Sequence, residues 1–242
     1  MRFGLLALGA TTLGTVAIAA LPANAGSFVF DSSNNGGNSK VGYHEYIKTT
    51  FNPDSEVFTW ESTFGAKDGN LAEGAWLVIN DGPNPKQADN EELTIYYLDA
   101  TNIVDGYGIL SAYAYNGKNN SNSWKNSSNF IQSWDKALKV TKTDDQISFK
   151  FSIDATDINS QSQFGSDWQG TQFNEKVGIW FHGADGLTTE YDSNGKLTNF
   201  SFEQRGWYDV ADQDAEHVPE PALALGLGAA AAVGIVRRKR SA

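Results

Sequence analysis

The segment Ser55–Phe64, with the sequence SEVFTWESTF, decides the fold class of this chain. Its hydrophobic Phe58 and Trp60 share one face of an extended strand, because side chains two positions apart point the same way. The polar Thr59 and Glu61 lie on the opposite face. A helix would instead repeat its hydrophobic residues every three to four positions, so the segment predicts a half-buried β-strand.

Similar runs recur between residues 26 and 218. Each is rich in β-branched or aromatic residues and ends at Gly, Asn, Asp or Pro. The runs are GYHEYIKTTF, GAWLVIND, ELTIYYLDA, GILSAYAYN, KALKVTK, QISFKFSID, KVGIWFH and KLTNFSFEQ. About nine to eleven strands with little helix pattern predict an all-β fold, an antiparallel β-sandwich of the jelly-roll type. No linker divides the segment, so residues 26–218 are predicted to form one domain.

Two connecting segments have their own patterns. Asp154–Ser160 begins with a good N-cap residue and predicts a single helical turn. Asn116–Asn129 is rich in Asn and Ser, which predicts a surface loop without regular structure.

Charge and composition exclude several classes of function. The central segment holds 13 of the 18 Lys and Arg and 28 of the 29 Asp and Glu, an excess of 15 negative charges. Such a field repels phosphate backbones, so no nucleic acid partner is expected. The chain has no cysteine, which excludes disulfides, Cys-ligated zinc and thiol catalysis.

Sequence motifs of catalysis are absent. His44, His182 and His217 stand at no metal-binding or triad spacing, and a structural role is expected for each. There is no GxSxG motif, and no ExDxE run of the kind that laminarinase-like β-sandwich glycosidases carry. No catalytic residue is predicted.

Calcium is the candidate metal, because it takes oxygen ligands from Asp, Asn and backbone carbonyls in loops. The candidate ligands are Asp81, Asp89, Asp185 and Asp192. The alternative is that these residues hold turns for backbone reasons alone.

The tryptophans fall into two groups. Trp60, Trp76 and Trp180 are predicted to be buried by their strand context. The others stand in or near polar segments, where exposed rings could stack on sugars; they are Trp124, Trp134, Trp168 and Trp207. The alternative is that these four rings close the open ends of the sandwich.

Residues 1–25 have the pattern of a signal peptide. Arg2 precedes a hydrophobic run, and Ala23-Asn24-Ala25 is a small-x-small cleavage pattern. Cleavage by signal peptidase is predicted between Ala25 and Gly26, with an N-terminal membrane anchor as the alternative.

The C-terminal segment, residues 219–242, combines three elements in a fixed order. Pro219-Glu220-Pro221 precedes an uncharged hydrophobic run over residues 222–236, and the basic cluster Arg237, Arg238, Lys239 and Arg240 follows. A helix of that length spans about 22 Å, short for a hydrocarbon core of roughly 30 Å. The cations would stay on the cytoplasmic side of the membrane.

This tripartite end resembles the PEP-CTERM sorting signal of Gram-negative bacteria, in which an N-terminal signal peptide is also present. The resemblance implies a transient anchor in the inner membrane, cleavage near the PEP motif by an exosortase, and delivery to the cell surface or the extracellular polysaccharide matrix. A permanent single-pass anchor is the alternative. The central segment is similar to exported cyanobacterial proteins that carry the same tail. This similarity indicates neither an activity nor any site residues.

Three functions remain open at this point. The first is a non-catalytic surface protein that binds or organises extracellular polysaccharide. The second is a structural or adhesive matrix protein without sugar specificity. The third is a glycoside hydrolase whose carboxylate pair the sequence does not reveal.

Overall fold

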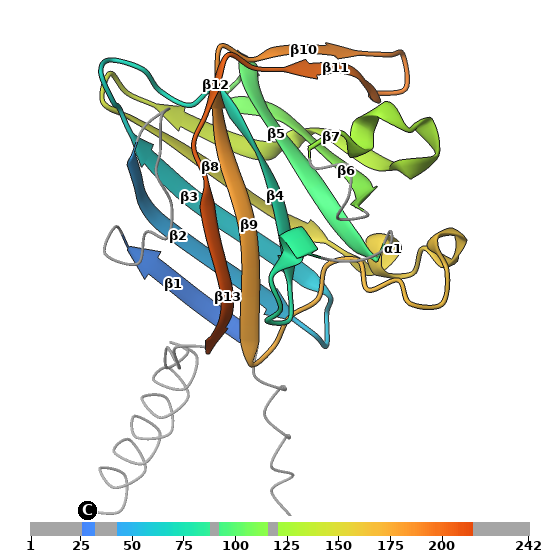
Figure 1. Cartoon of the computed structure of the whole chain (residues 1–242). Coiled ribbons are helices and arrows are strands. Elements are labelled where there is room, and N and C mark those ends of the chain that lie inside the picture. The colour runs from blue at the N-terminus through green and yellow to red at the C-terminus, as the bar shows by residue number, and fades with distance from the viewer. Residues whose placement is uncertain (1–25, 32–42, 88–91, 116–120, 215–242) are drawn as a thin grey trace, which may run out of the picture.

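The computed structural model describes residues 26–31, 43–87, 92–115 and 121–214 (Figure 1). Eleven strands form one antiparallel sheet, and β10 and β11 form a separate hairpin. The sheet strands are β1 (Gly26–Asp31), β2 (Tyr43–Asn52), β3 (Val57–Gly65), β4 (Gly74–Asn80), β5 (Leu93–Val104), β6 (Tyr107–Tyr115), β7 (Phe130–Lys142), β8 (Gln146–Asp154), β9 (Lys176–Asp185), β12 (Gln204–Arg205) and β13 (Tyr208–Asp214). The hairpin strands are β10 (Thr188–Tyr191) and β11 (Leu197–Ser201). The all-β, antiparallel prediction is confirmed.

Helical segments are short. The turn predicted near Asp154 is confirmed as α1 (Thr156–Asn159), with the Thr156 N–H donating to Oδ1 of Asp154 at 2.9 Å. The 3-10 helices are η2 (Pro85–Gln87), η3 (Ser123–Lys125), η4 (Ser127–Asn129) and η5 (Ser162–Phe164).

The surface position predicted for the loop before β7 is confirmed for most of its described residues, but the prediction that it lacks regular structure is wrong. Residues 121–129 contain η3 and η4 and bury Ser121, Ser123 and Asn129. The Tyr97 hydroxyl donates to the Ser121 carbonyl oxygen at 2.7 Å, so this segment is fastened to the sheet.

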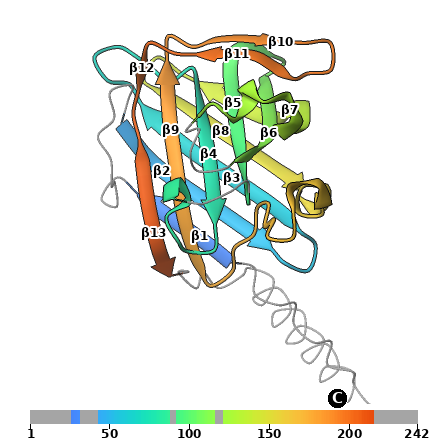
Figure 2. The same cartoon turned by 45° about the vertical axis from the view of Figure 1, so that its right-hand side comes forward.

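The strand order is β1-β2-β3-β8-β7-β6-β5-β4-β9, with β12 and β13 both pairing with β9 at the end. Most neighbours in the sheet are also neighbours in the sequence, and the sheet coils until its two ends approach each other (Figures 1 and 2). The jelly-roll sandwich is therefore not confirmed, because the described strands form one continuous coiled sheet.

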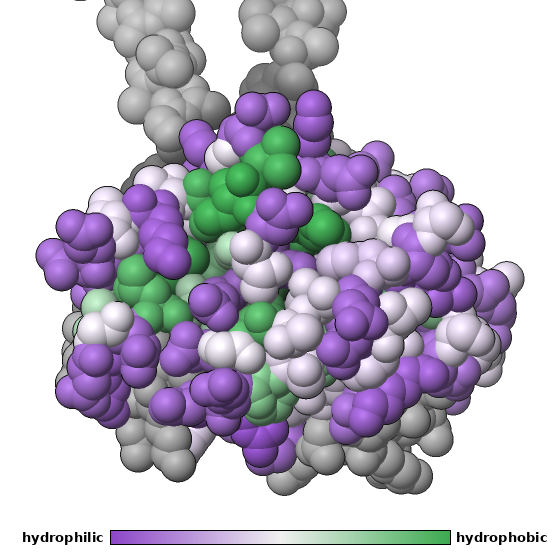
Figure 3. Space-filling model, turned by 90° about the horizontal axis from the view of Figure 1, so that it is seen from above, coloured by the Kyte–Doolittle hydropathy of each residue, from purple (hydrophilic) through white to green (hydrophobic). Residues whose placement is uncertain are grey.

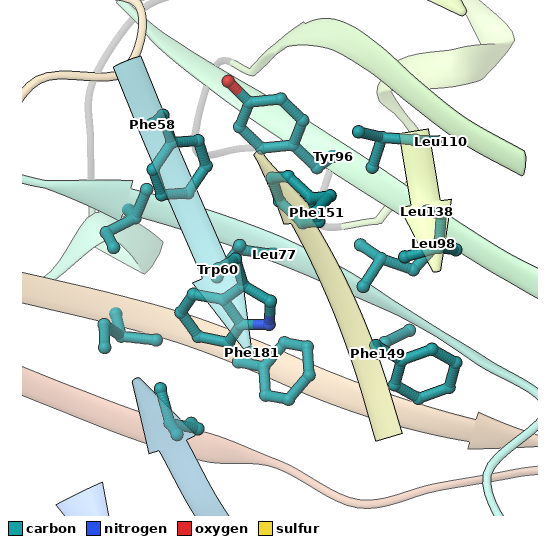
Figure 4. Packing of buried hydrophobic residues seen from close by; sticks show 14 of the residues in the cluster. Phe58, Trp60, Leu77, Tyr96, Leu98, Leu110, Leu138, Phe149, Phe151 and Phe181 are labelled. Atoms are coloured by element: carbon teal, nitrogen blue, oxygen red, sulfur yellow. The ribbon is translucent and has the colours of Figure 1, made fainter. Parts of the chain in front are cut away.

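The inner face of the coiled sheet encloses a core of aromatic side chains. Trp60 of β3 lies 4.9 Å from Phe181 of β9, measured between ring centroids, and Phe58 lies 5.5 Å from Tyr96 of β5. Figure 4 shows these rings packed between the two halves of the sheet. The alternation in the opening segment is confirmed, since β3 buries every second side chain along its length.

A second core lies on the outer face of β4, β5, β6 and β9. It contains Trp76 and Trp180, whose predicted burial is confirmed together with that of Trp60. The hairpin β10–β11 contributes Leu197 and Phe200 to this cluster. Every residue of β4 is buried as a result, which removes the alternation expected of a half-buried strand.

The two ends of the sheet meet through side chains. Among the described strands no backbone ladder joins β1 or β2 to β13. The Phe30 ring of β1 lies 5.8 Å from the Tyr208 ring of β13, and the His44 ring of β2 lies 4.5 Å from it. We call this contact region the seam; β1 and β13 lie side by side in Figures 1 and 2.

Candidate functional site

The sheet opens between β7 and β8. These strands pair with each other only over Lys139–Lys142. Before Lys139, β7 pairs with β6 alone, and the end of β8 from Phe151 onward pairs with β3 alone. A register shift on β7 between Trp134 and Leu138 produces a bulge, which bends the strand away from its neighbour. The two strands therefore diverge and leave a gap in the ladder.

A cleft of about 700 Å³ occupies this opening. This volume falls within the range of about 300–1,000 Å³ that is typical of small-molecule sites. Both diverging strands and α1 line it, through Gln132, Trp134, Asp135, Lys136 and Ala137 of β7, Ser152, Ile153 and Asp154 of β8, and Asp157 of α1.

Trp134 is the aromatic residue of the cleft. It is half-buried and packs against the inner core, so the core supports its indole. It pairs with Leu110 of β6, directly before the bulge. The ring is thus held by a strand at a place where part of its surface remains accessible to a ligand.

Polar groups surround this ring. Asp135, Asp154 and Asp157 bring three carboxylates to the cleft, against one cation on Lys136. Hydrogen bonds from the side chain and the backbone N–H of Thr156 hold the pKa of Asp154 below its usual range. Asp154 is therefore a permanent hydrogen-bond acceptor at neutral pH, which suits it to hydroxyl groups and not to the role of a general acid.

The other three candidate tryptophans lie elsewhere. The Trp168 Nε1–H donates to the Ile158 carbonyl oxygen at 2.8 Å, and its ring lies 4.6 Å from Phe164. Trp124 packs against the outer core, and Trp207 is 38% exposed. Of the four predicted ligand-binding rings, only Trp134 lines the cleft.

The described candidate calcium ligands Asp81, Asp185 and Asp192 are not grouped around one metal site. Asp192 accepts hydrogen bonds at Oδ1 from the backbone N–H groups of Asn194 and Lys196, and these bonds lower its pKa. Asp81 accepts one from the Asn174 N–H at 3.1 Å, Asp185 ends β9, and Asp89 lies outside the described residues. Within the described ranges, no group of three or more His, Asp or Glu side chains is placed to hold one metal ion.

The predicted processing signals fall on parts of the chain outside the described ranges. This applies to Ala25 and to every residue of the sorting motif, whereas Gly26 is the first residue of β1. Among the helices of the described residues, none combines the length and hydrophobicity needed to cross a membrane.

Sequence reasoning missed the other residues of the cleft. Gln132, Asp135 and Lys136 of β7 share a cleft with Asp157 of α1 only because β7 and β8 diverge. The one local signal is the adjacent pair Asp135-Lys136, two charged residues that interrupt a strand, which is a pattern of bulges and protected edges.

Comparisons with family models, with curated proteins and with solved structures find no match to this chain.

Proposed function

We propose that this chain is an exported surface protein that binds extracellular polysaccharide in the cleft between β7 and β8, without catalysis of its own. The observation that carries the proposal is the half-buried Trp134 in a cleft of about 700 Å³. Sugar rings stack their C–H faces on indoles, and carboxylates and amides bond the hydroxyls at the ring edge.

The polar lining supports a polyhydroxylated ligand. Gln132 offers both donors and acceptors, whereas Asp154 offers acceptors, and they stand on opposite walls of the cleft. A ligand between the two strands could also bond the backbone groups that the interrupted ladder leaves without a strand partner.

The proposal of export with cleavage after Ala25 rests on the signal-peptide pattern of residues 1–25. Gly26, the predicted new N-terminus, pairs with Phe51 in the first strand. For residues 219–242 we retain the proposal of a sorting tail recognised by an exosortase, which would place the protein at the surface of a Gram-negative cell.

A matrix protein without sugar specificity is the second candidate. The same interrupted ladder favours it, because an extended peptide could add to the open edge of β7 or β8. A glycoside hydrolase is the third candidate, since three carboxylates line the cleft. The lowered pKa of Asp154 speaks against that residue as the acid of such an enzyme.

The first experiment is a binding screen of the purified protein against soluble and insoluble polysaccharides, with calcium and then with a chelator. Saturable binding to a polysaccharide that leaves its chain length unchanged supports the proposal. Binding that is lost when the chelator is added would show that the site requires calcium. Release of shorter sugars would instead favour the hydrolase, and failure to bind any glycan would favour the matrix protein.

A further inference from the structure

Strand β13 touches two buried histidines through two consecutive residues. Tyr208 lies against the ring of His44 from β2, with ring centroids 4.5 Å apart. Asp209 lies beside His182 of β9, with Oδ1 3.7 Å from Nε2. Because neighbouring residues on a strand point to opposite faces, the two histidines lie on opposite sides of the sheet.

Among the described residues, His44 at the seam has no charged partner. Its side chain is 2% exposed, and the Phe64 ring of β3 lies 6.1 Å away. The ion pairs among the described residues are Lys150–Glu61 and His182–Asp209, so no carboxylate there neutralises a charge on His44. Burial lowers the pKa of His44 to about 4, and the backbone of Tyr46 offsets part of this effect.

His182 has a different environment. Burial also lowers its pKa, but Asp209 opposes this shift, while Arg205 and Lys86 add to it. The Trp76 ring stacks on His182 at 4.7 Å. A charge on His182 would therefore meet a carboxylate on β13, whereas a charge on His44 would meet aromatic rings and the backbone of Tyr46, with no carboxylate paired to it among the described residues.

We propose that protonation of His44 opens the seam, so that closure of the coiled sheet by β13 is sensitive to acid. The strand is suited to this role because, among the described strands, it pairs only with β9, and that pairing is interrupted between Val210 and Gln213. On its other side β13 is held by side-chain contacts to Phe30 and His44.

Acid should favour opening because the closed seam accommodates neutral His44 better than protonated His44. In the open state the imidazole is in water and titrates near 6.5, so acid draws the equilibrium toward opening as the pH falls from 6.5 toward 4. At about pH 5 the equilibrium constant for opening rises about 30-fold above its neutral value.

Hydrogen exchange of the full chain tests the proposal, with rates corrected for the intrinsic effect of pH. Between about pH 7.5 and about pH 5, amides of Tyr208–Asp214 should lose about 30-fold of their protection. Amides of β5, in the middle of the sheet, should keep theirs. His44→Phe, which keeps an aromatic ring at the seam, should remove most of the loss, whereas the control His182→Phe should retain most of it.

Three results would overturn the proposal: an unchanged acid response in His44→Phe, equal loss of protection in β5 and β13, or no loss in the unmodified chain. A second measurement covers the case in which His44→Phe does not fold. NMR titration of the unmodified protein should show a His44 resonance that stays neutral at pH 6 while the seam is closed. Normal titration of that resonance near 6.5 with the seam intact would also overturn the proposal.

Discussion

The hydroxyl of Tyr191 donates a hydrogen bond of 2.8 Å to Oδ2 of Asp99, and this contact fastens the β10–β11 hairpin to β5. Thr189 donates to the same oxygen at 2.6 Å, and Thr101 donates to Oδ1 through both its backbone N–H and its hydroxyl. Asp99 is 3% exposed, so these four bonds replace the water that its carboxylate would otherwise hold.

Loss of this acceptor should destabilise the protein. Asp99→Asn should lower the free energy of unfolding by about 2 kcal/mol, because the bonds to a charged acceptor are replaced by weaker neutral ones. Tyr191→Phe should lower the free energy of unfolding by about 1.5 kcal/mol, because it removes one of the donors to the Asp99 carboxylate. Urea unfolding of both single variants and the double variant measures their coupling; strictly additive effects would mean that the Tyr191–Asp99 bond contributes nothing.

The first strand should be essential to the core. Phe30 is 4% exposed and contacts Tyr208 across the seam, so Phe30→Ala should cost about 3 kcal/mol in unfolding free energy. Val29 on the outward, half-exposed side of β1 is the matched control, and Val29→Ala should cost less than about 1 kcal/mol. Equal effects of the two substitutions would show that β1 does not pack as described.

Buried tyrosines should resist alkaline titration. Burial raises the pKa values of Tyr96, Tyr97, Tyr113, Tyr115 and Tyr191, and Asp99 raises that of Tyr191 further. The folded state therefore favours the neutral phenols, and stability should fall as the pH rises above about 10, where unfolded tyrosines ionise.

Ultraviolet titration measures this directly. Of the nine tyrosines in the chain, these five should stay protonated at pH 11 as long as the protein is folded, and should ionise together when it unfolds. Smooth titration of all nine near pH 10 without unfolding would contradict the described core.

The end of the molecule seen from above carries hydrophobic surface in separate patches among polar residues (Figure 3). Among the described residues, the exposed large hydrophobic side chains are Ile103, Val104 and Trp207. Scattered exposed residues of this kind are ordinary for a protein surface. Trp207 lies outside the β7–β8 cleft, so Trp207→Ala removes a partly exposed tryptophan without altering the lining of that cleft.

The alternation of hydrophobic and polar residues correctly predicts strands that have one face buried, such as β3. Phe58 and Trp60 alternate with half-exposed Thr59 and Glu61, because β3 has one face toward the core and one toward solvent. The same rule could not describe Trp76 and its neighbours on β4, since a hairpin more than a hundred residues later in the chain covers their outer face. That cover depends on tertiary packing, which a sequence window does not contain.

Of the residues that line the cleft, only Trp134 is identified from the sequence as a candidate for ligand binding. Its aromatic ring in a polar context makes Trp134 one of four candidate ligand-binding residues in the sequence, but the opening around it depends on where the β7–β8 ladder stops. Ladder length is set by pairing between strands and by the bulge after Trp134, so the sequence did not identify Gln132 or Asp157 as its neighbours.

The most direct test of the central proposal compares two tryptophan variants on whichever polysaccharide the screen identifies. Trp134→Ala should weaken binding at least about tenfold, the loss expected when a stacked ring is removed. Trp207→Ala should bind as the unmodified protein does, and circular dichroism should show both variants folded. Undiminished binding by folded Trp134→Ala would contradict polysaccharide recognition in the β7–β8 cleft.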